Sequence, residues 1–201
     1  DNGNPLWYMD EKDANDNLTG KRVTTSDYAS ASYYYVNKSS LPKVYGGFNT
    51  SLSWKGFDLS AIFAYSIGGY IYNRDITMIL HNGSLEGRDW STEILKRWTP
   101  ENRYTDVPAL STTSNNWNSA STRFLQNNSY MRLKNLTLSY DLPKQWISKL
   151  ALSSVQVFVQ GDNLFTIHRN QGLDPEQGIT GITYYRYPAM RTISGGINLS
   201  F

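Results

Sequence analysis

The side chains that most often perform chemistry are scarce in this sequence. It has no cysteine and only two histidines, His81 and His168, which excludes disulfides, thiolate metal sites and a cysteine nucleophile. Neither histidine has companions at the spacing of a metal site or a catalytic triad. Nucleophile-elbow, zinc-protease and phosphate-loop motifs are absent as well. We therefore expect no enzyme and no metal or other cofactor.

Two groups of carboxylates have spacings close to those of known sites. Asp10, Asp13 and Asp16 occupy the polar stretch DEKDANDNLTG, but a calcium loop needs oxygen ligands at alternating positions and a glycine at its sharp turn. The spacing of three and the late glycine favour a solvated loop. Asp174 and Glu176 could suggest the carboxylate pair of a glycoside hydrolase. Within GLDPE, we interpret them as residues that fix a turn in a loop.

The composition excludes further classes. The net charge is +2 and no basic stripe is interleaved with aromatic residues, so nucleic acid is not an expected partner. No run of about 18 apolar residues predicts a transmembrane helix. Aromatic residues make up 14%, whereas charged residues make up 18%, below the usual level of about a quarter. A membrane β-barrel tolerates this balance because its strands bury only every second residue.

Five segments alternate apolar and polar residues with the period of two that predicts β-strands. They are residues 44–54, 57–67, 130–141, 154–167 and 190–201. Lys55 and Gly56, between the first two segments, predict a tight hairpin turn. The third segment changes phase along its length, and a β-bulge near Lys134 and Asn135 would restore one continuous apolar face.

The connections between these segments alternate strictly in length. Residues 1–42, 70–123 and 168–190 are long, whereas the Lys55-Gly56 turn and residues 142–153 are short. Outer-membrane barrels have this alternation, with short periplasmic turns and long extracellular loops. If Phe201 lies at the periplasmic end, the apolar-face residues Trp54, Phe57 and Tyr140 fall at its level, as an interfacial aromatic girdle requires.

One short helix is predicted in the long segment 70–123. Asp89 is its candidate N-cap, and Trp90 and Trp98 lie on one face at helical spacing. Glu93 and Arg97 are placed to form an ion pair at i,i+4.

Four blocks resemble, in the same order, the SusC/RagA family of TonB-dependent outer-membrane transporters. They are LPKVYGGFNTSLSWKGFDLSAIFAYSIGGYIYN (residues 41–73), YMRLKNLTLSYDLPKQW (130–146), VQVFVQGDNLFTI (155–167) followed by GLDPE (172–176), and RTISGGINLSF (191–201). The resemblance implies an all-β fold, in which the chain supplies about the last five antiparallel strands of a barrel of about 22 strands. Residues 1–201 would then be the C-terminal segment of the barrel, and the plug and the earlier strands would be absent from it.

The resemblance also implies a function for the whole protein. It would be a multi-pass β-barrel of the outer membrane of a Bacteroidetes-type bacterium that imports oligosaccharides or peptides. Its expected partners are a SusD-like surface lipoprotein that lids the barrel, TonB through the absent N-terminal part, the barrel-assembly machinery, outer-membrane lipid and the glycan or peptide substrate.

Two sets of candidate site residues follow from this topology. The first set consists of aromatic residues in the expected extracellular loops, whose ring faces can stack on sugar rings. The alternative is that they pack within the loops or contact the lipoprotein. They are Trp90, Trp98, Trp117, Tyr184 and Tyr185. The end of the chain resembles the signal that the barrel-assembly machinery recognises, with an ordinary amphipathic strand as the alternative; its residues are Gly195, Ile197, Leu199 and Phe201.

Two other protein classes stay open at this level. The first is a soluble or secreted β-sandwich that binds carbohydrate through the same aromatic residues, and the second is a glycosidase fragment. A sandwich buries the apolar faces of two sheets against each other, whereas a barrel wall leaves the apolar face of a single sheet to lipid. The number of sheets and the exposure of the apolar face therefore discriminate between these classes.

Overall fold

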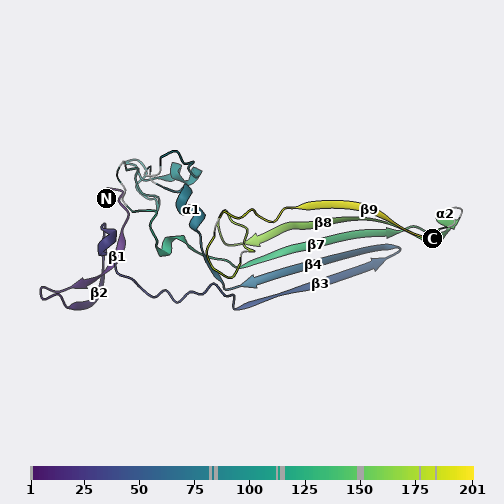
Figure 1. Ribbon diagram of the computed structural model, residues 1–201, viewed down its shortest axis with the longest axis horizontal. Helices are drawn as coiled ribbons and strands as arrows, with labels where there is room; N and C mark the ends of the chain where they lie inside the picture. The colour runs from purple at the N-terminus through teal and green to yellow at the C-terminus, as the bar shows by residue number, and fades with distance from the viewer. Residues whose placement is uncertain are drawn as a thin grey trace. The chain divides into compact units, whose positions relative to one another are not determined.

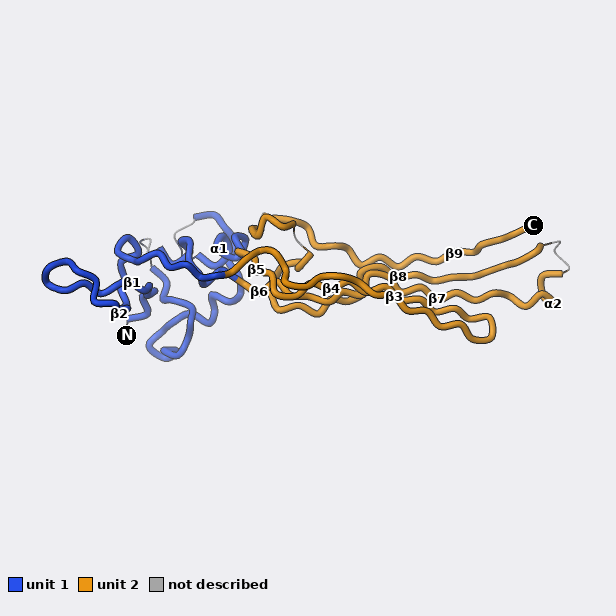
Figure 2. The backbone as a smooth tube through the Cα atoms, turned by 90° about the horizontal axis from the view of Figure 1, so that it is seen from below, with its two compact units in different colours: residues 1–37, 73–125 blue, residues 38–72, 126–201 orange. Residues whose placement is uncertain are grey.

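A computed structural model describes all residues except 1, 82, 84, 85, 112, 114, 115, 149–151, 177 and 184. The chain forms two compact units, coloured separately in Figure 2. The first, called the loop unit below, comprises residues 1–37 and 73–125. The second, called the sheet unit, comprises residues 38–72 and 126–201.

The sheet unit contains one antiparallel sheet of five strands in the order β3-β4-β7-β8-β9 (Figure 1). The strands are β3 (Val44–Trp54), β4 (Phe57–Ile67), β7 (Tyr130–Asp141), β8 (Ser154–His168) and β9 (Thr192–Ser200). Each strand pairs with the next of these five along the chain. The five predicted strands are confirmed, with small differences in the bounds of the last two.

The β3–β4 hairpin turns as the sequence predicts. Trp54 pairs with Phe57, which leaves Lys55 and Gly56 as a two-residue turn. Both have positive φ, 48° at Lys55 and 87° at Gly56, as a type I′ turn requires. Such a turn matches the right-handed twist of the strands and fixes their register.

The predicted β-bulge is confirmed at Lys134. The pairing of β7 with both neighbours skips this residue, between Leu133 and Asn135. The extra residue reverses the alternation, so that Met131 and Leu133 lie on the same face as Leu136. The apolar face therefore continues along the whole of β7.

Short elements complete the sheet unit. β5 (Tyr70–Tyr72) and β6 (Leu125–Asn127), whose first residue is counted with the loop unit, form a two-stranded sheet. The connection between β7 and β8 contains one helical turn, α2 (Lys144–Ile147).

The loop unit has its own secondary structure and core. It contains the hairpin of β1 (Trp7–Lys12) and β2 (Leu18–Thr25), the helix α1 (Arg74–Ile79), and the 3₁₀ turns η1 (Tyr28–Ser30), η2 (Thr92–Lys96) and η3 (Thr122–Phe124). Leu80, Ile94, Val107 and Trp117 form a buried cluster against which Ile76 packs. This cluster lets the segment fold although most of it has no regular structure.

Two sequence predictions are corrected in the loop unit. The predicted helix is the 3₁₀ turn η2, which is capped by Ser91 rather than Asp89, and Glu93 pairs with Lys96 at 2.8 Å rather than with Arg97. With three residues per turn, a 3₁₀ helix aligns positions i and i+3. The acidic stretch is a hairpin rather than a loop alone: Asp10 lies in β1, and Oδ1 of Asp13 accepts hydrogen bonds from the N–H groups of the turn.

Candidate functional site

One face of the five-stranded sheet is apolar and open. Register places most of the apolar residues of the five strands on this face, with Ile62 and Phe158 on the other, and Leu52, Trp54 and Ile197 are 67%, 64% and 63% exposed. The other sheets in the described part of the chain have two strands each. The apolar face is therefore not buried against a second large sheet, which contradicts the β-sandwich alternative.

Aromatic residues cross this face in a row next to the β3–β4 turn. Trp54 pairs with Phe57, and Phe57 pairs with Tyr140 at a ring-centroid distance of 4.4 Å. The row continues through Val157 to Ile197. Phe201 lies four residues beyond Ile197 along the chain and is outside this pairing row. Because the strands of a barrel are tilted, one pairing row crosses several membrane levels, so the common level of Phe201 with Trp54, Phe57 and Tyr140 stays a prediction.

The opposite face is mostly polar and holds a buried ion-pair network. Arg132 in β7 is 4% exposed. Its guanidinium donates to Oδ1 of Asp174 at 2.5 Å, to Oε2 of Glu176 at 2.7 Å and to Oγ1 of Thr166 at 2.8 Å. Lys134, the bulge residue, adds a second cation 2.8 Å from Oε2 of Glu176. These bonds attach the loop between β8 and β9 to the sheet.

Asp174 also organises the loop itself. Its carboxylate accepts hydrogen bonds from the N–H groups of Glu176 at 2.9 Å and Ala189 at 2.6 Å. Burial alone would raise the pKa of Asp174, but these two N–H groups and the Arg132 guanidinium outweigh it and hold the pKa below its ordinary value. The general acid of a glycosidase needs a raised pKa, so this environment supports the turn-fixing interpretation.

Trp117 is buried in the loop unit and is not accessible to a ligand. It is 3% exposed in the core of the loop unit. Its Nε1–H donates to the carbonyl oxygen of Leu80, and the Arg123 guanidinium lies 4.1 Å from its ring centroid. Since both groups occupy the surroundings of the indole, a sugar has no access to its face in this structure. The packing alternative holds for this residue.

The other aromatic candidates differ in exposure. Trp90 is partly exposed, and its Nε1–H donates to Nδ1 of His81 at 3.1 Å. Trp98 is half-buried and packs so closely on Gly3 that a Cβ there would lie 2.7 Å from the ring. Tyr185 is exposed and belongs to the sheet unit, whereas the three tryptophans belong to the loop unit. Tyr184 lies outside the described residues.

His81 has a structural environment. It is buried, and its Nδ1 accepts hydrogen bonds from Trp90 and from the N–H of Gly83. Burial lowers the pKa of His81, so the neutral imidazole that accepts these bonds is the favoured form. Within the residues that the structure describes, no group of three or more His, Cys, Asp or Glu side chains is placed to hold a metal ion.

The last strand places the proposed assembly residues on the apolar face. Gly195, Ile197 and Leu199 of β9 pair with Val159, Val157 and Val155 of β8. Phe201 follows the end of β9 and is exposed. Three of the four residues are thus part of the sheet, and the aromatic side chain extends beyond it.

Comparison with known proteins identifies the family. No family model matches the sequence. TonB-dependent receptor P3 of Formosa agariphila is 33% identical over 166 residues, which cover 77% of this chain and 16% of the relative. TonB-dependent receptor P26 of the same bacterium is 30% identical over 81% of the chain, and SusC of Bacteroides thetaiotaomicron is 27% identical over 83%.

Solved structures agree with these relatives along almost the whole chain. The RagAB peptide importer in its closed-closed state superposes with a TM-score of 0.79 at 35% identity and covers 99% of the chain. Its open-open state gives a TM-score of 0.80 at 34% identity. The chain belongs to the SusC/RagA family of TonB-dependent transporters. It spans 16–17% of the length of the curated relatives and 21% of the RagAB chain that it matches.

Family membership explains the two faces of the sheet. SusC/RagA proteins are outer-membrane β-barrels, and the five strands correspond to a portion of such a wall, with an apolar and a polar face. The relatives are named as receptors and transporters rather than enzymes. In the described residues, the helices are all too short or too polar to span a bilayer.

Proposed function

We propose that this chain forms part of the barrel wall and of the extracellular surface of a TonB-dependent importer in the bacterial outer membrane. The observation that supports this most strongly is the single five-stranded sheet with an open apolar face, in a chain that matches RagAB over 99% of its length. Lipid would cover this face. Burying each large apolar side chain contributes roughly 1.5–3 kcal/mol, so exposing the whole face to water would be unfavourable.

We assign residues 1–201 to the C-terminal segment of the barrel. β3 and β9 each have a neighbour on one side only, and a hydrocarbon layer does not tolerate unpaired backbone groups. The remaining strands and the plug would therefore come from other parts of the full-length protein. The pattern of Gly195, Ile197, Leu199 and Phe201 would be recognised by the barrel-assembly machinery.

The cargo and the partners are proposed from the family. The RagAB structure is that of a peptide importer, and the resemblance to SusC/RagA transporters implies oligosaccharides or peptides, so we propose one of these two classes as the transported molecule. A SusD-like lipoprotein would lid the barrel from outside, and TonB would act through the absent N-terminal part. Among the described residues of the predicted aromatic set, Trp90 and Tyr185 are exposed, and we propose them as contacts for the cargo or the lid.

Cysteine labelling of intact cells tests this topology. The chain has no cysteine of its own, so single cysteines can be placed at Leu95 and Tyr185 for the loops and at Lys55 and Gln145 for the turns. A membrane-impermeant maleimide should label the first two from outside and the last two only after the outer membrane is permeabilised. Labelling of the turns alone in intact cells would contradict the proposal.

A further inference from the structure

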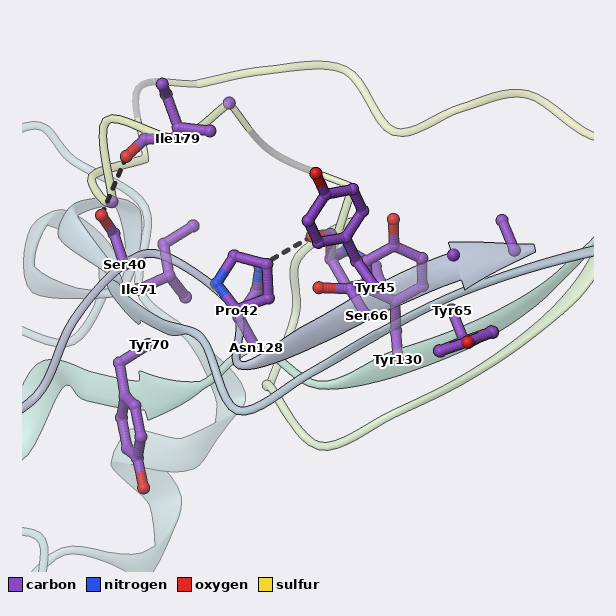
Figure 3. A pocket seen from close by; sticks show the side chains of 15 residues that line it. Ser40, Pro42, Tyr45, Tyr65, Ser66, Tyr70, Ile71, Asn128, Tyr130 and Ile179 are labelled. Carbon is purple, nitrogen blue, oxygen red and sulfur yellow. Dashed lines mark hydrogen bonds between the residues drawn. The ribbon is translucent and has the colours of Figure 1, made fainter.

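The two ends of the five-stranded sheet carry different features. At one end, the polar face holds a cavity of about 310 Å³, whose lining includes the paired row of Tyr45, Ser66 and Tyr130 from three adjacent strands (Figure 3). At the other end, the β3–β4 turn carries Lys55 next to the aromatic row of the apolar face. This second end combines a cation with aromatic rings on an open surface, a combination that suits a ligand with both charged and apolar parts.

Lys55 occupies a backbone conformation that does not favour lysine. Its φ is 48° at the first central position of the turn, where type I′ turns prefer Asn, Asp or Gly. Glycine tolerates this left-handed region because it lacks a Cβ, and Asn and Asp tolerate it because their short side chains hydrogen-bond locally. Lysine has neither property. An unfavourable backbone conformation of this kind suggests that the side chain itself has a role.

The ammonium group of Lys55 lies beside the apolar face. Its Nζ is 4.9 Å from the ring centroid of Trp54, which is exposed on that face. The acidic residues next to the turn, Asp58 and Asp141, occupy polar-face positions, and the Asp58 carboxylate accepts a hydrogen bond from the Ser53 hydroxyl. Among the residues that the structure describes, Lys55 therefore has no ion-pair partner.

Two further hydrogen-bond donors lie around the same turn. The Trp54 indole N–H and the Tyr140 hydroxyl make no hydrogen bond to another described residue. The Tyr140 ring lies next to the turn, since a Cβ on Gly56 would be 3.3 Å from it. An ammonium and an indole N–H can only donate, whereas a phenol both donates and accepts. This set of groups therefore fits a ligand with a negative charge and several acceptor oxygens.

We propose that Lys55, Trp54 and Tyr140 bind the headgroup of an anionic phospholipid in the inner leaflet of the outer membrane. The inference rests on the proposed importer function and its topology. The Lys55 ammonium would pair with the phosphate, and the other two groups would donate to phosphate and ester oxygens. Tryptophan and tyrosine are favoured at this level of a membrane because one end of each side chain is apolar and the other is polar. Long lysine side chains likewise extend their charge toward the headgroups.

The surroundings of the turn favour a lipid over a soluble phosphate. A soluble phosphate could pair with Lys55, but it would leave the exposed side chains of Leu52 and Trp54 in water. A phospholipid supplies both the charge and the acyl chains that would cover these side chains. By the proposed topology the turn is periplasmic, and the leaflet on that side of the outer membrane consists of phospholipid.

The test measures which lipid contacts the wall beside the turn. The full-length transporter, reconstituted in bilayers, would carry a fluorophore on Leu52→Cys, two residues from Trp54 on the apolar face. Phosphatidylglycerol and phosphatidylcholine with brominated acyl chains quench such a fluorophore on contact, so mixtures of the two give their relative affinity at this position. We expect phosphatidylglycerol to be preferred about fivefold, the effect of one lysine near an anionic headgroup. Glycerol phosphate in the aqueous phase should not compete.

Lys55→Asn is the decisive variant because it removes the charge without disturbing the turn. Asparagine suits the backbone conformation better than lysine, so the hairpin should be at least as stable. The preference for phosphatidylglycerol should disappear, and Lys55→Arg should keep it. Lys144→Asn removes an exposed lysine from the connection between β7 and β8; it is the matched control and should keep the preference as well.

The outcomes separate this inference from the proposed function. Equal affinity of the two lipids in the unmodified protein, or a preference that Lys55→Asn leaves unchanged, would overturn the headgroup site while the importer function stands. An equal loss in Lys144→Asn would indicate a general effect of charge and would overturn it too, as would competition by glycerol phosphate. A fluorophore at position 52 that neither lipid quenches would instead contradict the lipid-facing wall, and with it the proposed function.

Discussion

The loop unit and the sheet unit treat the same kinds of side chain in opposite ways. In the loop unit, Leu80, Ile94, Val107 and Trp117 are 3–6% exposed and pack on one another. In the sheet unit, residues of similar type form an apolar face that is largely open, and its contacts run along the sheet, as in the stacked pair Phe48 and Phe63 at 4.7 Å. A compact core removes apolar side chains from water, whereas an open apolar face is stable when lipid covers it.

The two units also differ in the interactions that stabilise them. The loop unit depends on a small core and on capped turns, such as the one formed by Asp13. The sheet unit depends on strand pairing and on the ion pairs that attach its largest described loop to β7. Substitutions in one unit should therefore leave the other intact.

Trp117→Ala is the sharpest way to disturb the loop unit. Removing a buried tryptophan should cost about 3–5 kcal/mol, and the loss should stay within this unit. We expect faster protease cleavage in residues 73–125 of the purified full-length protein, with the sheet unit unaffected. Tyr104→Ala, at a fully exposed position of the same unit, should cleave at the wild-type rate. Equal protection of Trp117→Ala and wild type would show that this core does not hold the unit together.

Arg132→Met tests the corresponding contact in the sheet unit. It leaves the carboxylates of Asp174 and Glu176 without their buried partner, which costs about 3–5 kcal/mol in comparable pairs. Hydrogen exchange should accelerate in the loop between β8 and β9, and the loop unit should be unchanged. Adding Asp174→Asn to Arg132→Met should recover part of the protection, because the buried carboxylate is then neutral while Glu176 keeps its ion pair with Lys134. Failure of this rescue would contradict the ion-pair explanation.

A charged substitution on the apolar face tests whether lipid or water contacts this face. Leu138→Arg lies two residues from the Tyr140 row in the central strand, so it should cost less than a substitution at the bilayer midplane, which costs about 2–4 kcal/mol, and should still reduce the amount of protein in the outer membrane. Ser139→Arg introduces the same side chain one residue later, on the polar face, and should be tolerated. Equal levels of the two variants would mean that the faces are not distinguished by lipid.

Acid should weaken the attachment of the loop between β8 and β9. Because the folded-state pKa of Asp174 lies below the ordinary value of 3.8, its contribution is complete above that value and is lost as the pH falls through the folded-state pKa. A fluorophore on Tyr187→Cys should therefore gain rotational freedom in acid. In the Asp174→Asn background the fluorophore should be mobile at neutral pH already, and the acid-induced change should be smaller.

Sequence predicts the sheet well and the loop unit poorly, and one physical reason explains both. Alternation with a period of two follows from having two faces in different environments, so β3, β4 and the bulge at Lys134 were accessible from sequence. β1 begins with three apolar residues in succession, and β2 is mostly polar and exposed. Their hairpin depends on backbone pairing and on its turn, which leave no periodic pattern.

The site residues follow the same division. Burial of Trp117 depends on contacts with residues more than 20 positions away, such as Leu80 and Ile94, and no local pattern reports them. The row of Tyr45, Ser66 and Tyr130 required the register of three strands, which the strand predictions alone did not supply. A lone arginine in β7 and the acidic pair in GLDPE were visible signals for the Arg132 network, but only the fold brings them together.

The most direct test of the account is the environment of alternate residues along β7 in the full-length protein in a bilayer. Nitroxide labels would be attached to single cysteines at positions 136 to 140, and their collisions with oxygen and with a water-soluble nickel complex would be measured. We predict that Leu136, Leu138 and Tyr140 favour oxygen, which concentrates in lipid, whereas Thr137 and Ser139 do not. A profile without alternation, or apolar positions shielded from both reagents as in a packed core, would contradict a lipid-facing wall.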